Sequence, residues 1–130
     1  MGEPTEWSHE QSWLGRPQDV AASRHFVAAH LRDHDLHDLV DDARLVVSEL
    51  SANAVQHADT PYTVTLTSYD GVVEIAVGDG DGELMTGPSF HAHAFGLGGR
   101  GLGVVGQLSS EWGVRPGTDG GKTVWALLTV

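Results

Sequence analysis

The segment Glu49-Leu50-Ser51-Ala52-Asn53-Ala54-Val55-Gln56-His57 lies inside a longer stretch with helical periodicity. Residues four apart share one face of a helix, so Glu49, Asn53 and His57 form a polar stripe on an otherwise largely apolar helix. A carboxylate in such a stripe can accept a proton, and a carboxamide oxygen can hold a hard cation such as Mg²⁺. The alternative is a solvated polar edge without a role, and the stripe alone does not decide between them.

The periodicity around this segment predicts a long helix from about Asp38 to His57, with its apolar positions on one buried stripe. A shorter helix is expected over residues 18–31, before the polar break Asp33-His34-Asp35. Residues 1–12 show no sustained pattern. We therefore expect a flexible N-terminal segment there, followed by one domain over residues 13–130.

Strand patterns follow the long helix. Residues 62–69 alternate with a period of two, Asp70-Gly71 is a strong hairpin signal, and residues 72–77 form the return strand. Downstream, the pattern predicts a short helix over residues 102–111 and strands over residues 112–114 and 122–130. Strands grouped against helices indicate an α+β fold, a two-layer α/β sandwich with a mostly antiparallel sheet covered on one face by helices.

A first glycine-rich segment, Val77-Gly78-Asp79-Gly80-Asp81-Gly82, comes directly after a predicted strand. An ionised carboxylate only accepts hydrogen bonds, so Asp79 at the strand end can receive one from an exocyclic amine of a purine. The alternative is an acidic turn, since Asp-Gly pairs are common turn formers. A calcium loop is disfavoured because no glutamate stands at the required later position.

A second segment, Gly96-Leu97-Gly98-Gly99-Arg100-Gly101-Leu102-Gly103-Val104-Val105, is the stronger signal. Glycines let the backbone approach a ligand closely, and a helix that begins in the same place favours phosphate oxygens at its N-terminus. Arg100 can add a charge-assisted contact. The segment is not a Walker A loop, because the Gly-Lys-Ser/Thr ending is absent, and it lacks the preceding strand of a dinucleotide fingerprint.

The composition narrows the class of function. The formal net charge is −11, with 18 acidic and 7 basic residues, which disfavours direct nucleic-acid binding. Residues 1–96 carry a net charge of −12 and residues 97–130 a net charge of +1, so the last quarter is where a small polyanion is electrostatically permitted. Cysteines, a secretory signal pattern and a long apolar window are all lacking, so we expect a cytoplasmic protein.

Two other polar features have plain alternatives. His30, His34 and His37 have a spacing that can bind zinc on a continuous helix, but the polar break around His34 favours solvated histidines at a helix end. Lys122 can reach a phosphate, and an exposed lysine at a strand edge fits the sequence equally well.

Four motifs occur together in a particular order: Glu-x-x-x-Asn on a helix, the Asp79 box at a strand end, Gly-x-Gly-Leu-Gly opening a helix, and Gly120-Gly121-Lys122-Thr123 on the last strand. This order resembles the GHKL ATPases, the superfamily that shares the Bergerat ATP-binding fold of gyrases and histidine kinases. The forms Val-Ser-Glu-Leu-x-x-Asn-Ala-x-x-His-Ala and Gly-Arg-Gly-Leu-Gly are most similar to the stand-alone anti-sigma-factor serine kinases. The resemblance covers roughly residues 15–130.

The resemblance implies a histidine-kinase-like ATPase domain that binds ATP and Mg²⁺. Asn53 would ligate Mg²⁺, and Glu49 would act as general base toward a serine hydroxyl of a partner protein. Asp79 would accept a hydrogen bond from the adenine amino group, with Thr123 nearby. The remaining cofactor-binding residues would be Gly99, Arg100, Gly101, Leu102 and Gly103, and residues 83–98 would form the ATP lid.

By the same resemblance, the protein would be an anti-sigma factor and serine-protein kinase. It would phosphorylate an anti-sigma-factor antagonist and sequester a sigma factor, regulating transcription without contacting nucleic acid or membrane, and the family suggests a homodimer. One departure favours an alternative, a non-catalytic module of the same fold that holds a protein partner with weak or no nucleotide binding. The family's Asp-x-Gly-x-Gly box has Asp81 and Glu83 at its glycine positions, which adds negative charge beside a nucleotide.

Overall fold

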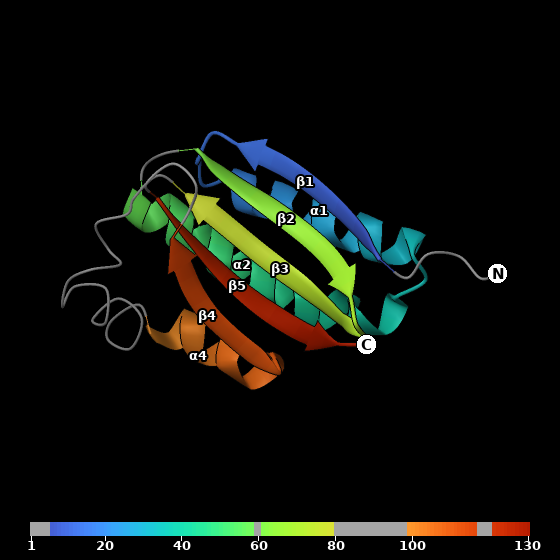
Figure 1. Ribbon diagram of the computed structural model, residues 1–130. Helices are drawn as coiled ribbons and strands as arrows, with labels where there is room; N and C mark the ends of the chain where they lie inside the picture. The colour runs from blue at the N-terminus through green and yellow to red at the C-terminus, as the bar shows by residue number, and fades with distance from the viewer. Residues whose placement is uncertain (1–5, 59–60, 80–98, 117–120) are drawn as a thin grey trace.

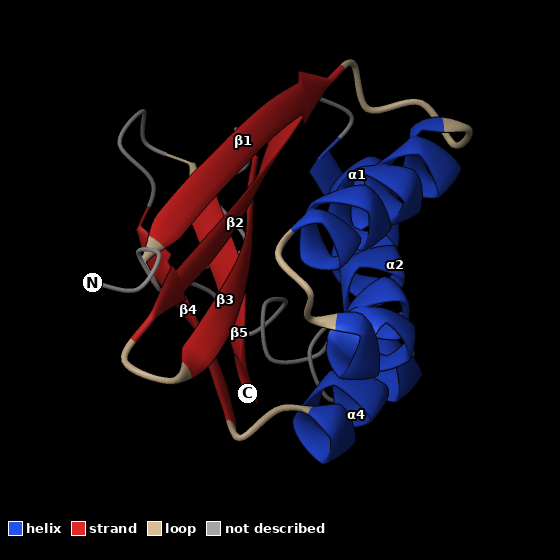
Figure 2. Cartoon of the chain, turned by 90° about the vertical axis from the view of Figure 1, so that its right-hand side faces the viewer, coloured by secondary structure: helices blue, strands red, loops and turns tan. Residues whose placement is uncertain are grey.

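The computed structural model describes residues 6–58, 61–79, 99–116 and 121–130, and for residues 57, 58 and 99–102 it describes the backbone only. One five-stranded sheet carries helices on one of its faces, as Figures 1 and 2 show. The elements in chain order are β1 (Trp7–Trp13), α1 (Asp19–Asp33), a short 3-10 helix η1 (His37–Leu39), α2 (Val40–Ala58), β2 (Tyr62–Tyr69), β3 (Val72–Asp79), α4 (Gly99–Leu108), β4 (Glu111–Pro116) and β5 (Lys122–Thr129).

The sheet has the strand order β1-β2-β3-β5-β4, and every neighbouring pair among these strands is antiparallel. The β2–β3 hairpin turns at Asp70 and Gly71, which have φ angles of 48° and 78°. Two successive positive φ angles are what a tight two-residue hairpin turn requires, so the Asp-Gly signal predicted this turn correctly.

The core lies between the sheet and the helices. Helix α2 lies between α1 and α4, and packs against both of them (Figure 2). The inner face of the sheet and the facing stripes of the helices supply the largest fully buried side chains, among them Tyr62, Leu31, Leu50, Leu66, Ile75, Val27, Val46 and Val105. The predicted α+β two-layer sandwich is confirmed. None of the helices in the described ranges is long and apolar enough to cross a membrane.

The N-terminal part differs from the sequence prediction. Residues 7–12, expected to be flexible, form most of β1, which pairs with β2 from Trp7 opposite Ser68 to Trp13 opposite Tyr62. Trp13 ends this strand, while Leu14 after it is 66 % exposed. The alternating pattern was hidden because the inner positions between the two tryptophans are held by polar His9 and Gln11, which a search for apolar alternation passes over.

Candidate functional site

The elements that carry the predicted motifs begin or end at one end of the molecule. Figure 1 shows that β3 ends, β5 begins, α2 ends and α4 begins on the same side, away from the two chain termini. The sheet register fixes this arrangement, because Asp79 at the end of β3 lies opposite both Tyr62 on β2 and Lys122 on β5. The antiparallel hairpin and the last strand therefore bring polar residues from three strands into one row.

Asp79 and Lys122 form an ion pair across β3 and β5. The Nζ atom of Lys122 donates to Oδ2 of Asp79 at 2.9 Å, and the two side chains are 8 % and 3 % exposed, respectively. Both residues face the helices, because they continue the inner alternation of Val77 on β3 and Val124 on β5. The alternative of an exposed lysine at a strand edge is therefore wrong, and Lys122 is a buried partner of the predicted purine-binding carboxylate.

Thr123 lies on the other face of the sheet. It stands opposite Gly78, and a Cβ atom added to Gly78 would lie 3.2 Å from the Thr123 hydroxyl oxygen. Because successive side chains of a strand point to opposite faces, the hydroxyl is directed away from the face that carries Asp79. The strand alternation, counted back from buried Val124, is the sequence signal that could have placed Lys122, and not Thr123, on the inner face of the sheet.

Tyr62 extends the polar row toward α1. Its hydroxyl lies 2.8 Å from Ser23 Oγ, which donates to the Asp19 carbonyl at 2.9 Å, so Tyr62 donates to Ser23. Burial raises the pKa of the Tyr62 hydroxyl, which stays a donor at neutral pH. The Asp19 carboxylate accepts from the Arg16 guanidinium at 3.0 Å and from its backbone N–H at 2.9 Å, and these bonds lower the pKa of Asp19. This network fixes the start of α1 over the sheet.

Glu49 and Asn53 lie on one flank of α2. On the opposite flank, Ser48 accepts a hydrogen bond from Arg24 of α1 at 3.3 Å. At about 100° per residue, Glu49 and Asn53 fall on the other side of the buried stripe, away from α1. Figure 1 places α4 on that side, and both side chains are partly exposed. The predicted proton acceptor and amide oxygen thus face the edge of α2 along which α4 packs.

The second glycine segment opens α4, as predicted. Gly99, Arg100, Gly101 and Leu102 form its first turn, and Gly103 in the next turn is exposed, with nothing within 4 Å of a Cβ added there. The predicted ATP lid, residues 83–98, lies outside the described residues, and so do Asp81 and most of the Asp79 box.

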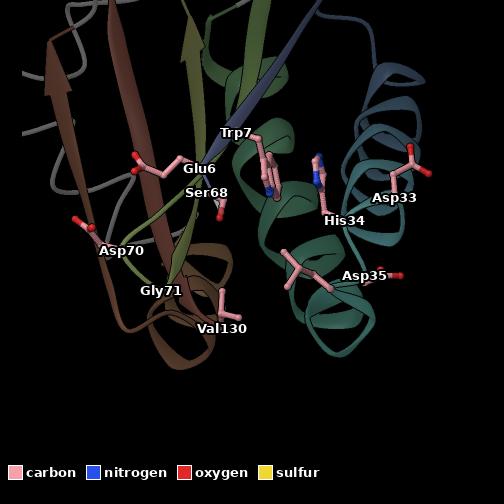
Figure 3. A pocket seen from close by; sticks show the side chains of 10 residues that line it. Glu6, Trp7, Asp33, His34, Asp35, Ser68, Asp70, Gly71 and Val130 are labelled. Atoms are coloured by element: carbon pink, nitrogen blue, oxygen red, sulfur yellow. The ribbon is translucent and has the colours of Figure 1, made fainter. Parts of the chain in front are cut away.

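A pocket of about 430 Å³ lies at the opposite end of the molecule and was not predicted (Figure 3). Its lining includes Trp7, His34, Ser68 and Val130. The rings of Trp7 and His34 stack at 3.9 Å with 5° between their planes, and His9 stacks on His30 at 3.8 Å. This pocket is separate from the row of Tyr62, Asp79 and Lys122.

His30, His34 and His37, which the sequence disfavoured as a zinc site, make other contacts in the structure. His34 hydrogen-bonds to His9 of β1 at 2.9 Å between their Nε2 atoms, and His37 lies 3.6 Å from Asp35, which is exposed. Within the described ranges, no group of three or more histidine, aspartate or glutamate side chains could hold a metal ion. The amide oxygen of Asn53 nevertheless offers a donor of the kind that Mg²⁺ prefers.

The fold and these residues define a small α+β domain. The ends of β3 and α2 and the starts of α4 and β5 lie on the same side of it. A family model described as the histidine kinase-like ATPase domain matches residues 15–128, most of the chain. The chain therefore belongs to the histidine kinase-like ATPase domain family. Domains of this family generally bind ATP with Mg²⁺. Comparison with curated proteins gave no match.

Proposed function

We propose that this protein is an ATP-dependent serine-protein kinase and anti-sigma factor. It phosphorylates an antagonist protein, and it sequesters a sigma factor. One observation carries the proposal: the C-terminal half of α2, which bears Glu49 and Asn53, leads to the end of the domain where α4 begins and where β3 and β5 pair Asp79 with Lys122. A nucleotide bound there would meet all four motifs at once.

The proposed reaction assigns a task to each element. The serine hydroxyl oxygen of the antagonist bonds to the γ-phosphorus of ATP, the bond from that phosphorus to the bridging oxygen of ADP breaks, and Glu49 takes the hydroxyl proton. The amide oxygen of Asn53 would hold Mg²⁺, which neutralises phosphate charge. Arg100 and the backbone N–H groups at the start of α4 would hold phosphate oxygens.

A phosphotransfer assay with γ-labelled ATP, Mg²⁺ and candidate antagonist proteins tests the proposal. We expect Glu49→Gln to lower label transfer by about 100-fold or more, while ATP affinity changes little, because a general base acts in the transition state. Asn53→Ala should weaken Mg²⁺–ATP binding by at least about 10-fold. A panel of purified sigma factors, tested for co-elution with the protein, would identify the sequestered partner.

Gln56→Ala is the matched control, because Gln56 is exposed on the same helix and has no assigned task. Its transfer rate should equal that of the wild type. If Glu49→Gln transfers label as fast as the wild type, Glu49 is not the base and this catalytic assignment fails.

A specific observation favours a second function. The Asp79 box has Asp81 and Glu83 at the positions of the family's glycines, which adds negative charge beside the proposed nucleotide. This favours a non-catalytic module that holds a protein partner with little use of nucleotide. Calorimetry separates the two functions, since a protein that releases no heat and shows no thermal shift at millimolar ATP–Mg²⁺ is not the proposed kinase.

A further inference from the structure

The pair of Asp79 and Lys122 is unusual for the end of a sheet. Lysine is almost never fully buried unless it is paired, and here both side chains are more than nine-tenths buried with 2.9 Å between Nζ and Oδ2. Burying such a pair costs desolvation free energy that the attraction between the charges often fails to offset. An apolar pair would serve the fold at least as well, so the pair is better explained by a task at the strand ends.

The chemistry of the pair suggests that task. A carboxylate offers acceptors only, and an ammonium offers donors only, and the Lys122 ammonium donates to Asp79. Side by side, the two groups present an acceptor next to a donor. The edge of adenine presents the complement, since its 6-amino group is a donor and the adjacent ring nitrogen N1 is an acceptor.

We propose that Lys122 is a second base-reading residue, donating a hydrogen bond to N1 of adenine while Asp79 accepts one from the 6-amino group. This inference rests on the proposed function, because it assumes that a nucleotide occupies the site. Thr123 takes no part in it, because its side chain lies on the other face of the sheet. Lys122 is thus a residue that determines base specificity and has no part in phosphoryl transfer.

The test compares ATP with its 1-deaza analogue, which keeps the amino group but has C–H in place of N1. A hydrogen bond to a charged group contributes about 1.5–3 kcal/mol, so the wild-type protein should bind ATP at least about 10-fold more tightly than 1-deaza-ATP. The triphosphate of purine riboside, which lacks the amino group, tests the contact to Asp79 separately. Calorimetry with Mg²⁺ provides the three dissociation constants on unmodified protein, so this part does not depend on a variant that folds.

Variants then assign the effect to the residue. Lys122→Met should bind ATP and 1-deaza-ATP equally, and Thr123→Val, the neighbour on the opposite face, should keep the wild-type preference. Because Lys122→Met leaves the Asp79 carboxylate buried without this lysine, the double variant Asp79→Asn/Lys122→Met provides a second measurement in a site without that charge. It should show no preference either.

The outcomes distinguish a failure of this inference from a failure of the proposed function. If the wild type binds ATP, and Asn53→Ala weakens that binding, but ATP and 1-deaza-ATP bind equally, the role of Lys122 is overturned and nucleotide binding stands. A preference that persists in folded Lys122→Met also overturns it. If the folded wild type binds none of the three nucleotides, both the proposed function and this inference are wrong.

Discussion

At the scale of single residues, Gly103 is better explained by phosphate binding than by the stability of α4. It lies within α4, it is exposed, and an added Cβ would meet nothing within 4 Å. Glycine inside a helix costs about 0.5–1 kcal/mol relative to alanine, because it loses more backbone freedom on folding. A glycine at this position is explained if the backbone must approach a phosphate closely there.

The variant Gly103→Ala should therefore gain stability and lose affinity. We expect its free energy of unfolding without nucleotide to rise by about 0.5–1 kcal/mol, measured by urea titration. Its affinity for ATP–Mg²⁺, measured by calorimetry, should fall, because the methyl group stands where the backbone would meet the phosphate. Gln107→Ala, an exposed position on the same helix, is the control and should leave affinity unchanged. Unchanged affinity in Gly103→Ala would remove this residue from the phosphate-binding set.

The sequence alone predicted the relative placement of residues that local periodicity brings together. Glu49 and Asn53 share a flank of α2 because helical spacing alone puts them there. The partner of Asp79 depends on the register between β3 and β5, strands separated by more than 40 residues, and no local signal fixes such a register. Lys122 therefore became visible as the partner only when the strands were paired.

At the scale of elements, β1 is an edge strand with two attachments. Its hydrogen-bond ladder joins it to β2, and stacked aromatic rings join it to the α1 side of the helix layer. Trp7 stacks on His34, and His9 both stacks on His30 and hydrogen-bonds to His34. The bond between His9 and His34 joins two ring nitrogens, so at least one ring must be neutral to accept it. Periodicity could not predict this strand, because ring contacts with α1 replace the apolar side chains that a search for alternation requires.

Acid should loosen this attachment. Partial burial and the nearby His30 and His34 lower the pKa of His9 below its usual 6.5, while Asp33 opposes this shift. The unfolded chain therefore binds a proton at His9 more readily than the folded chain does. The contribution is fully present above about pH 6.5, and it is lost as the pH falls through the lower pKa of the folded state.

We expect hydrogen exchange of the β1 amides to accelerate between about pH 7.5 and pH 5.5, after correction for the intrinsic pH dependence of exchange. His9→Gln should reduce this acceleration, because the titrating ring is gone. His25→Gln is the control, since His25 is exposed on α1 and should leave the acceleration intact. Equal pH dependence in the wild type and in His9→Gln would show that His9 is not the responsible group.

At the scale of the whole molecule, the net charge of −11 causes repulsion between the acidic side chains. Opposing it, the described residues include two partly exposed ion pairs, Arg16–Asp19 at 3.0 Å and Arg115–Glu74 at 3.3 Å. Such pairs contribute little, typically below about 1 kcal/mol. Self-repulsion of a highly charged chain favours the expanded state, so repulsion should exceed these local attractions.

Sodium chloride should consequently stabilise the protein. The screening length falls from about 30 Å at 0.01 M to about 8 Å at 0.15 M, which weakens long-range repulsion more than contacts at ion-pair distance. We expect the Tm to rise over this range, measured by the circular dichroism of the folded domain. Glu10→Lys, an exposed substitution on β1 that reduces the net negative charge, should show a smaller rise. A Tm that falls with salt would mean that the ion pairs outweigh the net repulsion, and the folded state would then depend on surface pairs far more than their exposure indicates.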